Sequence, residues 1–483
     1  LATGRSMQAI GALQSLVHLE PDNILAFAFL ARALVMSGRE IEGAAIANLA
    51  IERVAGDTEI YLQAMLALQH LSFIDAASLK EIAVRFFIEF DAENSMKEVQ
   101  SVAVAPDRPY HIGFLSNGFH RSNIAEFVTP WFELSPPSTY EVSGYQMSTI
   151  SDGVTSQIMQ GCNNWQKVVD VDPWTLALSI GRDEIDVLVD LSHPDMETKS
   201  STLGLVSCPA CVGVCALPEP SLMPGVTHVL SDEVLAEADR NMLLDGQELI
   251  VVTGTLFARP PFSNPPKSDL APITDNGYAT FGAIAKLPHI SPEWTATVAK
   301  ILRNVENSKL LLFVHETLSQ QDRHKIREYF LNCGIVNQLF FADQDGTAEE
   351  ATVNTEGGRR QIPELFWQSI DVLLDTSPIN YHRELFEALW NGVPTITKQG
   401  NRRISSVGAS IIAAANRPRW ISRNDMQFIE LASSFALDAD NLQNERIELI
   451  KSIGDAPLFD FKSSSSRIRN ALQKVAAQNR MPA

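Results

Sequence analysis

The side chains best suited to chemistry lie in the second half of the chain, and the first of them is Lys286. It ends the run Phe281–Lys286, which predicts a strand leading into a turn. A lysine at the carboxyl end of a parallel strand faces a ligand crevice, where its ammonium group can neutralise a phosphate oxygen. The plain alternative is a solvated lysine in a loop.

A second group of candidates lies in the stretch from Asp375 to Trp390. A strand is expected to end at Asp375 and a helix to begin between Asn380 and His382, so that its free N–H groups and positive dipole end would suit a diphosphate. His382 could donate to a phosphate oxygen, and Glu387, further into the helix, could accept from a ribose hydroxyl. The alternative for Glu387 is an ordinary carboxylate on the helix surface.

Arg383 is unusual at this place, because a cation near a helix N-terminus is unfavourable unless an anion lies beside it. It either adds charge to a diphosphate site or pairs with Glu387 four residues later. The salt bridge is the slightly favoured interpretation.

Two glycines in the segments that follow have predicted structural roles. Gly392 is expected to end the helix, and Gly408 to allow a close approach of the backbone at the start of another helix.

These candidates need elements to hold them, and the pattern of the chain predicts an α/β fold. Apolar strands alternate with helical stretches in two series, which is typical of two doubly wound, Rossmann-like lobes with a ligand crevice between them. Helical periodicity fills the N-terminal part, and a spacing of about 35 residues resembles degenerate tetratricopeptide repeats, with a plain helical cap as the equal alternative. The predicted parts are a helical segment (1–100), an N-terminal lobe on the acceptor side (108–256), a proline-rich linker (257–275) and a C-terminal lobe on the nucleotide side (276–475). A polar insertion between residues 343 and 361 is expected to be a surface loop.

Composition excludes several classes of function. The 45% hydrophobic and 20% charged residues indicate globular protein, and the net charge of −20 argues against a dedicated nucleic-acid binder. No apolar run reaches the roughly 18 residues of a membrane span. Five cysteines make no disulfide framework, so a reducing, cytoplasmic location is expected. The chain opens at Leu1, which is compatible with a fragment that lacks a leader or further repeats.

The cysteines Cys208, Cys211 and Cys215 are close enough in the sequence to suggest a metal or iron–sulfur site. A fourth ligand at a suitable spacing is missing, so buried structural cysteines are the favoured interpretation. No metal site is therefore predicted.

Six segments, in this order, resemble glycosyltransferase family 41, the O-linked N-acetylglucosamine transferases with their Spindly-type and bacterial relatives. The likeness extends over roughly residues 60 to 475 and is carried by residues 112–119, 186–192, 281–286, 371–394, 407–410 and 457–460.

The resemblance implies a GT-B fold and transfer of a sugar, N-acetylglucosamine in the first place, from a UDP-sugar to serine or threonine hydroxyls of a protein acceptor. In the Spindly branch the donor is a GDP-sugar. Lys286 would bind the diphosphate, His382 would lie against it, Glu387 would hold the ribose, and Asn380 and Arg383 would belong to the same donor site. The chemistry implied is inverting and metal-independent, with the sugar nucleotide as substrate and no further cofactor.

The first lobe departs from the family's motifs. Ser122 stands where the family has a histidine, which leaves His193 as the N-lobe candidate for positioning the acceptor or assisting proton transfer. Arg383-Glu384 replaces a pair of hydroxyl side chains. Two alternatives therefore stay open: a catalytically silent relative that serves as a binding scaffold, and an N-glucosyltransferase of the adhesin-modifying type.

Overall fold

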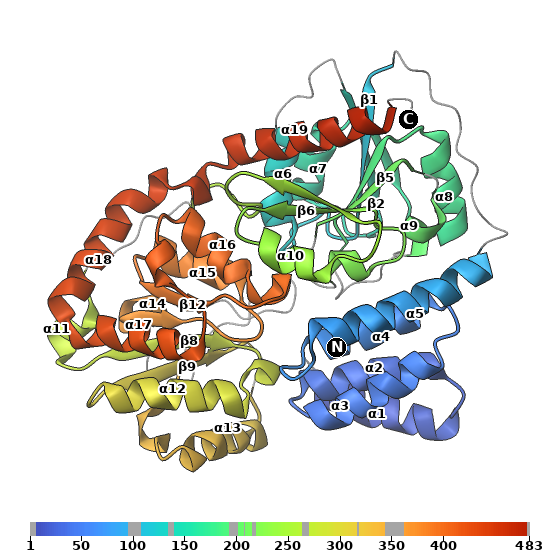
Figure 1. Cartoon of the computed structure of the whole chain (residues 1–483). Coiled ribbons are helices and arrows are strands. Elements are labelled where there is room, and N and C mark those ends of the chain that lie inside the picture. The colour runs from blue at the N-terminus through green and yellow to red at the C-terminus, as the bar shows by residue number, and fades with distance from the viewer. Residues whose placement is uncertain are drawn as a thin grey trace.

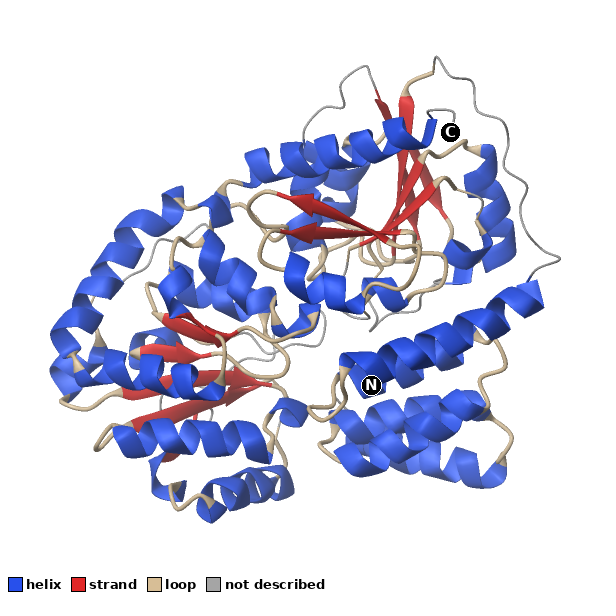
Figure 2. Ribbon diagram, viewed as in Figure 1, coloured by secondary structure: helices blue, strands red, loops and turns tan. Residues whose placement is uncertain are grey.

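The computed structural model describes residues 6–94, 108–133, 140–192, 201–206, 208–214, 219–262, 270–315, 318–342 and 362–480. Within these ranges the chain forms an N-terminal helical segment and two lobes, each built on a parallel β-sheet (Figure 1). Helices lie on both faces of each sheet (Figure 2). The predicted fold class, two doubly wound lobes preceded by a helical segment, is confirmed.

The helical segment forms because its helices bury their apolar faces against one another. Asn23 caps one helix by accepting the N–H of Ala26, and Asp57 caps another by accepting that of Ile60. The two caps are 34 positions apart, close to the predicted spacing of about 35 residues. The helices are α1 (Ser6–Leu19), α2 (Ile24–Met36), α3 (Glu40–Glu52), α4 (Thr58–Gln69) and α5 (Ala76–Asn94).

The N-terminal lobe has the strand order β3-β2-β1-β4-β5-β6-β7. Alternate residues of β1 serve opposite faces: Phe114 packs with α6, and Leu115 packs with α8. Its strands are β1 (Tyr110–Ser116), β2 (Tyr140–Gln146), β3 (Asn164–Lys167), β4 (Val187–Asp190), β5 (Ala210–Gly213), β6 (His228–Asp232) and β7 (Glu248–Val252). Its helices are α6 (Ala125–Glu133), α7 (Gly153–Gln160), α8 (Pro173–Arg182), α9 (Ser201–Leu205) and α10 (Ala236–Met242).

The C-terminal lobe has the strand order β10-β9-β8-β11-β12-β13, so β8 and β11 are neighbours at its centre. Its strands are β8 (Thr280–Ala285), β9 (Lys309–Val314), β10 (Leu339–Phe341), β11 (Val372–Leu374), β12 (Thr395–Lys398) and β13 (Ile421–Ser422). Helices α11 (Pro272–Asn276), α12 (Pro292–Asn304), α13 (Gln320–Asn332), α14 (Glu364–Ser369), α15 (His382–Trp390), α16 (Val407–Ala414), α17 (Asp425–Leu437) and α18 (Ala439–Ser452) accompany them.

Two boundaries differ from the sequence-based expectation. Pro272, at the end of the expected linker, opens the short helix α11, because proline is well tolerated in the first helical turn. The last helix, α19 (Phe461–Arg480), leaves the C-terminal lobe and packs along the N-terminal one (Figure 1). Its final arginine, Arg480, forms an ion pair there with Asp186. The predicted insertion at residues 343–361 lies outside the described residues.

A buried ion pair joins the two lobes. Arg403, in the 3₁₀ turn η4 (Arg403–Ser405) of the C-terminal lobe, contacts Asp239 of α10 at 2.7 Å, and both side chains are buried. Arg403 also donates to the carbonyl oxygens of Val214 and Leu230, at 2.6 Å each. These bonds hold the two lobes against each other.

Candidate functional site

The carboxyl edge of the C-terminal sheet brings the two predicted stretches together. Strands β8 and β11 pair in parallel with Ala283 opposite Leu374, so both strands end at this edge. Lys286 follows the last residue of β8 and is half-buried. The loop from Asp375 to the start of α15 follows β11. Parallel strands place ligands at this edge, which is where the sequence predicted them.

A hydrogen bond ties the two stretches to each other. The backbone N–H of Lys286 donates to the hydroxyl of Tyr381 at 2.7 Å. Tyr381 is the residue immediately before α15, and its hydroxyl also contacts Nδ1 of His289. The loop that carries Lys286 is therefore fixed to the N-terminus of α15.

His382 is the first residue of α15 and lies where the lobes meet. Its ring centroid is 5.0 Å from that of Phe127 in α6 and 6.3 Å from that of Phe257, which follows β7. The predicted helix start at residues 380–382 is thus confirmed, with the histidine half-buried between aromatic side chains.

Arg383 and Glu387 form the predicted salt bridge, with Nε and Oε1 3.0 Å apart. Arg383 also lies 3.3 Å from Glu126 of the N-terminal lobe, which in turn accepts a hydrogen bond from Arg259 at 2.7 Å. Burial raises the pKa of Glu387 to about 7, and Arg383 opposes that rise. These charges bridge the lobes directly beside the start of α15.

Asn380 is held inside the turn. Its Nδ2 donates to the carbonyl oxygen of Thr376 at 3.0 Å, and its Oδ1 accepts the N–H of Gly408 at 3.2 Å. A Cβ on Gly408 would lie only 2.5 Å from Oδ2 of Asp375, which confirms the predicted close approach there. Asn380 therefore shapes the loop through contacts within the lobe.

Sequence reasoning missed a buried pair in the first turn of α15. Glu384 and His315, which follows β9, approach to 2.8 Å, and both side chains are almost fully buried. His315 showed no partner pattern in the sequence because 69 positions separate the two residues. An acid at the first turn of a helix is favoured by the dipole, which was the available signal for Glu384.

The remaining predicted residues lie elsewhere or outside the described ranges. His193, the N-lobe candidate, is outside them. Ser122 accepts the N–H of Ala125 at 3.3 Å and so begins α6. Cys211 is buried in β5, as the structural interpretation of the cysteines expected. In the part of the chain that the structure describes, no group of three or more ligating side chains could hold a metal ion. In the same ranges, no helix is long and apolar enough to cross a bilayer.

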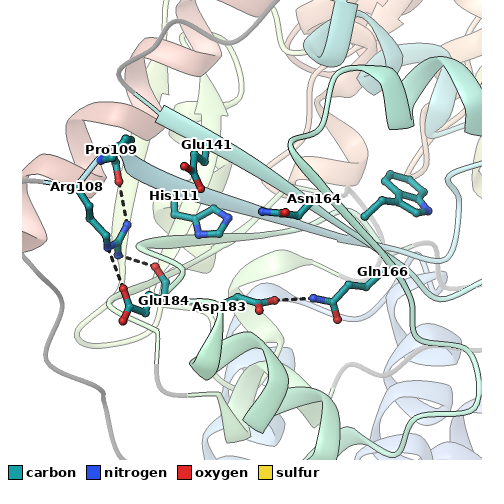
Figure 3. A pocket seen from close by; sticks show the side chains of 9 residues that line it. Arg108, Pro109, His111, Glu141, Asn164, Gln166, Asp183 and Glu184 are labelled. Atoms are coloured by element: carbon teal, nitrogen blue, oxygen red, sulfur yellow. Dashed lines mark hydrogen bonds and ion pairs between the residues drawn. The ribbon is translucent and has the colours of Figure 1, made fainter.

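A cavity of about 450 Å³ lies far from this edge, at the amino ends of β1 to β3 (Figure 3). Polar side chains that line it pair with one another: Arg108 with Glu184 at 3.3 Å, and Gln166 with Asp183 at 2.8 Å. The amino edge of a parallel sheet is not where such folds bind substrates.

Comparison with known proteins gives a consistent result. Residues 275–468 match the model of Glycosyl transferase family 41. A SPINDLY protein of Solanum lycopersicum, named as a probable UDP-N-acetylglucosamine–peptide N-acetylglucosaminyltransferase, is 23% identical over 359 residues, covering 74% of this chain and 37% of that protein. The SEC protein of Arabidopsis thaliana, named in the same way, is 23% identical over 362 residues, covering 72% and 35%. The chain thus spans less than half the length of these curated relatives.

A solved structure shares the fold. A mutant of the Thermobaculum terrenum O-GlcNAc transferase superposes with a TM-score of 0.81 at 20% sequence identity, covering 99% of this chain and 88% of that one. The arrangement of the lobes is therefore the predicted GT-B arrangement.

Proposed function

Because this chain is a divergent member of glycosyltransferase family 41, we propose that it transfers N-acetylglucosamine from UDP-N-acetylglucosamine to serine or threonine hydroxyls of a protein. The observation that carries the proposal is the junction of Lys286 with the N-terminus of α15 at the carboxyl ends of β8 and β11. The donor and the peptide acceptor are those after which the two relatives are named.

The proposed chemistry is a single displacement at the anomeric carbon. The acceptor oxygen attacks this carbon from the side opposite the diphosphate, the bond from the carbon to the diphosphate oxygen breaks, and the configuration inverts. The hydroxyl proton of the acceptor passes to a base, the role predicted for His193. Negative charge then grows on the departing diphosphate. Lys286, His382 and the positive dipole end of α15 would stabilise this charge and so take the part that a metal ion plays elsewhere.

Calorimetric titration of the chain with UDP, UDP-N-acetylglucosamine and GDP-fucose tests the donor site. We expect UDP to bind, and Lys286→Ala to weaken the binding by about 1.5–3 kcal/mol, the scale of a charged hydrogen bond. Lys300→Ala, at an exposed position of α12, serves as the matched control and should bind as the unaltered chain does. Absence of binding to all three nucleotides would refute the proposal, and an unchanged affinity in Lys286→Ala would show that Lys286 is misassigned.

The linkage to the acceptor needs its own measurement. Proteins incubated with the chain and UDP-N-acetylglucosamine should carry an added hexosamine, detected by mass spectrometry, that alkaline β-elimination releases. Release is expected because the sugar is attached to a serine or threonine oxygen. A modification that resists elimination would indicate attachment to asparagine nitrogen instead.

A further inference from the structure

A chain of hydrogen bonds connects the helical segment with the Lys286 loop. The backbone N–H of Lys286 donates to the Tyr381 hydroxyl, and that hydroxyl contacts Nδ1 of His289. On the other side of the His289 ring, Nε2 lies 3.1 Å from Nδ1 of His70. His70 directly follows α4, and its ring stacks on that of His289 with 5.3 Å between centroids.

Burial determines how protons are arranged in this chain. His289 is buried, and burial lowers its pKa well below the usual value, with the positive charge of nearby Lys286 acting in the same direction. A neutral imidazole carries one N–H, so one ring nitrogen of His289 donates and the other accepts. The Tyr381 oxygen accepts from Lys286, and we assign the hydroxyl's own proton to its contact with Nδ1 of His289. Nε2 of His289 then carries the proton and donates to His70.

From this geometry we infer that His70 is a positioning residue for the donor site: it accepts a hydrogen bond from Nε2–H of His289, and this bond orients Tyr381 and through it the Lys286 loop. The inference rests on the proposed function for the role of Lys286. It also means that the helical segment contributes to donor binding through His70, although His70 and Lys286 are 216 positions apart in the sequence.

The neighbouring residue shows that this end of α4 is a junction and not an incidental contact. The carbonyl oxygen of Gln69 accepts from Arg402 of the C-terminal lobe at 3.2 Å. Its side-chain oxygen accepts the N–H of Glu219 of the N-terminal lobe at 3.1 Å. The last turn of α4 is therefore bonded to both lobes, so His70 is held in place opposite His289.

Removing the acceptor nitrogen of His70 should disturb the series of hydrogen bonds as far as Lys286. In His70→Phe the stack can persist, but the buried N–H of His289 loses its partner, and we expect the affinity for UDP to fall by about fivefold or more. Tyr381→Phe removes the hydroxyl in the middle of the chain and should have the same effect. His70→Asn, whose amide oxygen can replace Nδ1 as acceptor, should keep the affinity within about twofold. His324→Ala, on the exposed face of α13, is the control and should bind normally.

The tautomer of His289 is a measurable property that a purely structural role of His70 would not affect. In the full chain labelled with ¹⁵N-histidine at pH 8, Nε2 of His289 should carry the proton and Nδ1 should be an acceptor, with signals assigned by their loss in His289→Gln. His70→Asn should keep this pattern and His70→Phe should change the Nε2 shift. Protonation at Nδ1 in the unaltered chain, or unchanged UDP affinity in either His70→Phe or Tyr381→Phe, would overturn the inference. Absence of UDP binding by the unaltered protein would instead refute the proposed function. The spectra would still show which group donates and which accepts in the hydrogen bonds of His289.

Discussion

At the scale of single residues, the site is marked by acids that the fold buries. Asp375 directly follows β11 and accepts hydrogen bonds from the Thr397 hydroxyl at 2.7 Å and from the N–H of Thr376 at 2.9 Å. These bonds favour the charged form, but burial is the larger effect and raises the pKa of Asp375 to about 7. The carboxyl group therefore shapes the loop before α15 at a cost in stability near neutral pH.

Replacing Asp375 should make that cost visible. At pH values between the ordinary pKa of a carboxyl, near 4, and about 7, Asp375 keeps its proton in the folded protein, whereas the unfolded chain has released it. Stability from this group is therefore complete below pH 4 and lost as the pH rises towards 7. In Asp375→Asn, which keeps an acceptor oxygen, the loss of unfolding free energy from pH 5 to pH 8 should be smaller by on the order of 2 kcal/mol, measured by urea unfolding.

The exposed Asp245 provides the matched substitution. Asp245→Asn should follow the unaltered chain across the same pH range. An equal pH dependence in Asp375→Asn and in the unaltered chain would contradict the account of a buried, protonated carboxyl.

Some residues of the site could be predicted from the sequence because their partners are near in the chain or their element is plain. The bridge from Arg383 to Glu387 follows from four-residue spacing on a helix, and Lys286 follows from the apolar run before it. The pairs His315–Glu384 and His70–His289 could not be predicted, because only the three-dimensional fold brings these residues together.

At the scale of elements, the packing of α16 on the loop after β11 positions the site. Gly408, the second residue of α16, is close to Asp375 and to the Thr397 hydroxyl, and its N–H donates to Asn380. The helix can approach the loop so closely because this residue has no side chain.

Gly408→Ala should therefore destabilise the protein although alanine favours helices. A Cβ here would meet Asp375 and the Thr397 oxygen below van der Waals distance, and we expect a loss of about 1–3 kcal/mol in thermal or urea unfolding. Gly153, the first residue of α7, has nothing within 4 Å of a built Cβ, so Gly153→Ala should be neutral or stabilising by about 0.4–1 kcal/mol. A Gly408→Ala protein as stable as the unaltered one would show that α16 is free to move.

Strands were predictable where apolar residues run together. The strand predicted from the run Phe281–Lys286 is β8, and the strand expected to end at Asp375 is β11. Strands β2 and β3 were missed: Tyr140–Gln146 mixes polar residues with Gly144, and Asn164–Lys167 is largely polar. β2 gains stability by pairing with β1, and β3 by pairing with β2, which a local pattern does not reveal.

At the scale of the whole molecule, the position of one lobe against the other defines the crevice. The buried Arg403–Asp239 pair and the return of α19 across the N-terminal lobe both fix this position. The partner of α19 could not be predicted, because its amphipathic pattern shows that one face is buried but not against which lobe.

Removing Arg403 should destabilise the molecule strongly. Arg403→Ala leaves the Asp239 carboxylate buried without its cation, at a cost of about 3–5 kcal/mol in unfolding free energy. Arg423 and Glu237 also bridge the lobes, at 3.6 Å, but both are exposed, so Arg423→Ala should cost less than about 1 kcal/mol. Equal effects of the two substitutions in chemical unfolding would contradict the role assigned to the buried pair.

The central claim, that Lys286 and the N-terminus of α15 form one diphosphate site, is tested most directly by hydrogen–deuterium exchange of the full chain with and without UDP. Backbone amides in the segments 284–290 and 380–386 should exchange more slowly when UDP is bound. Those of β3, beside the cavity at the amino ends of the N-terminal sheet, should be unchanged. UDP that binds without protecting either segment would contradict the claim.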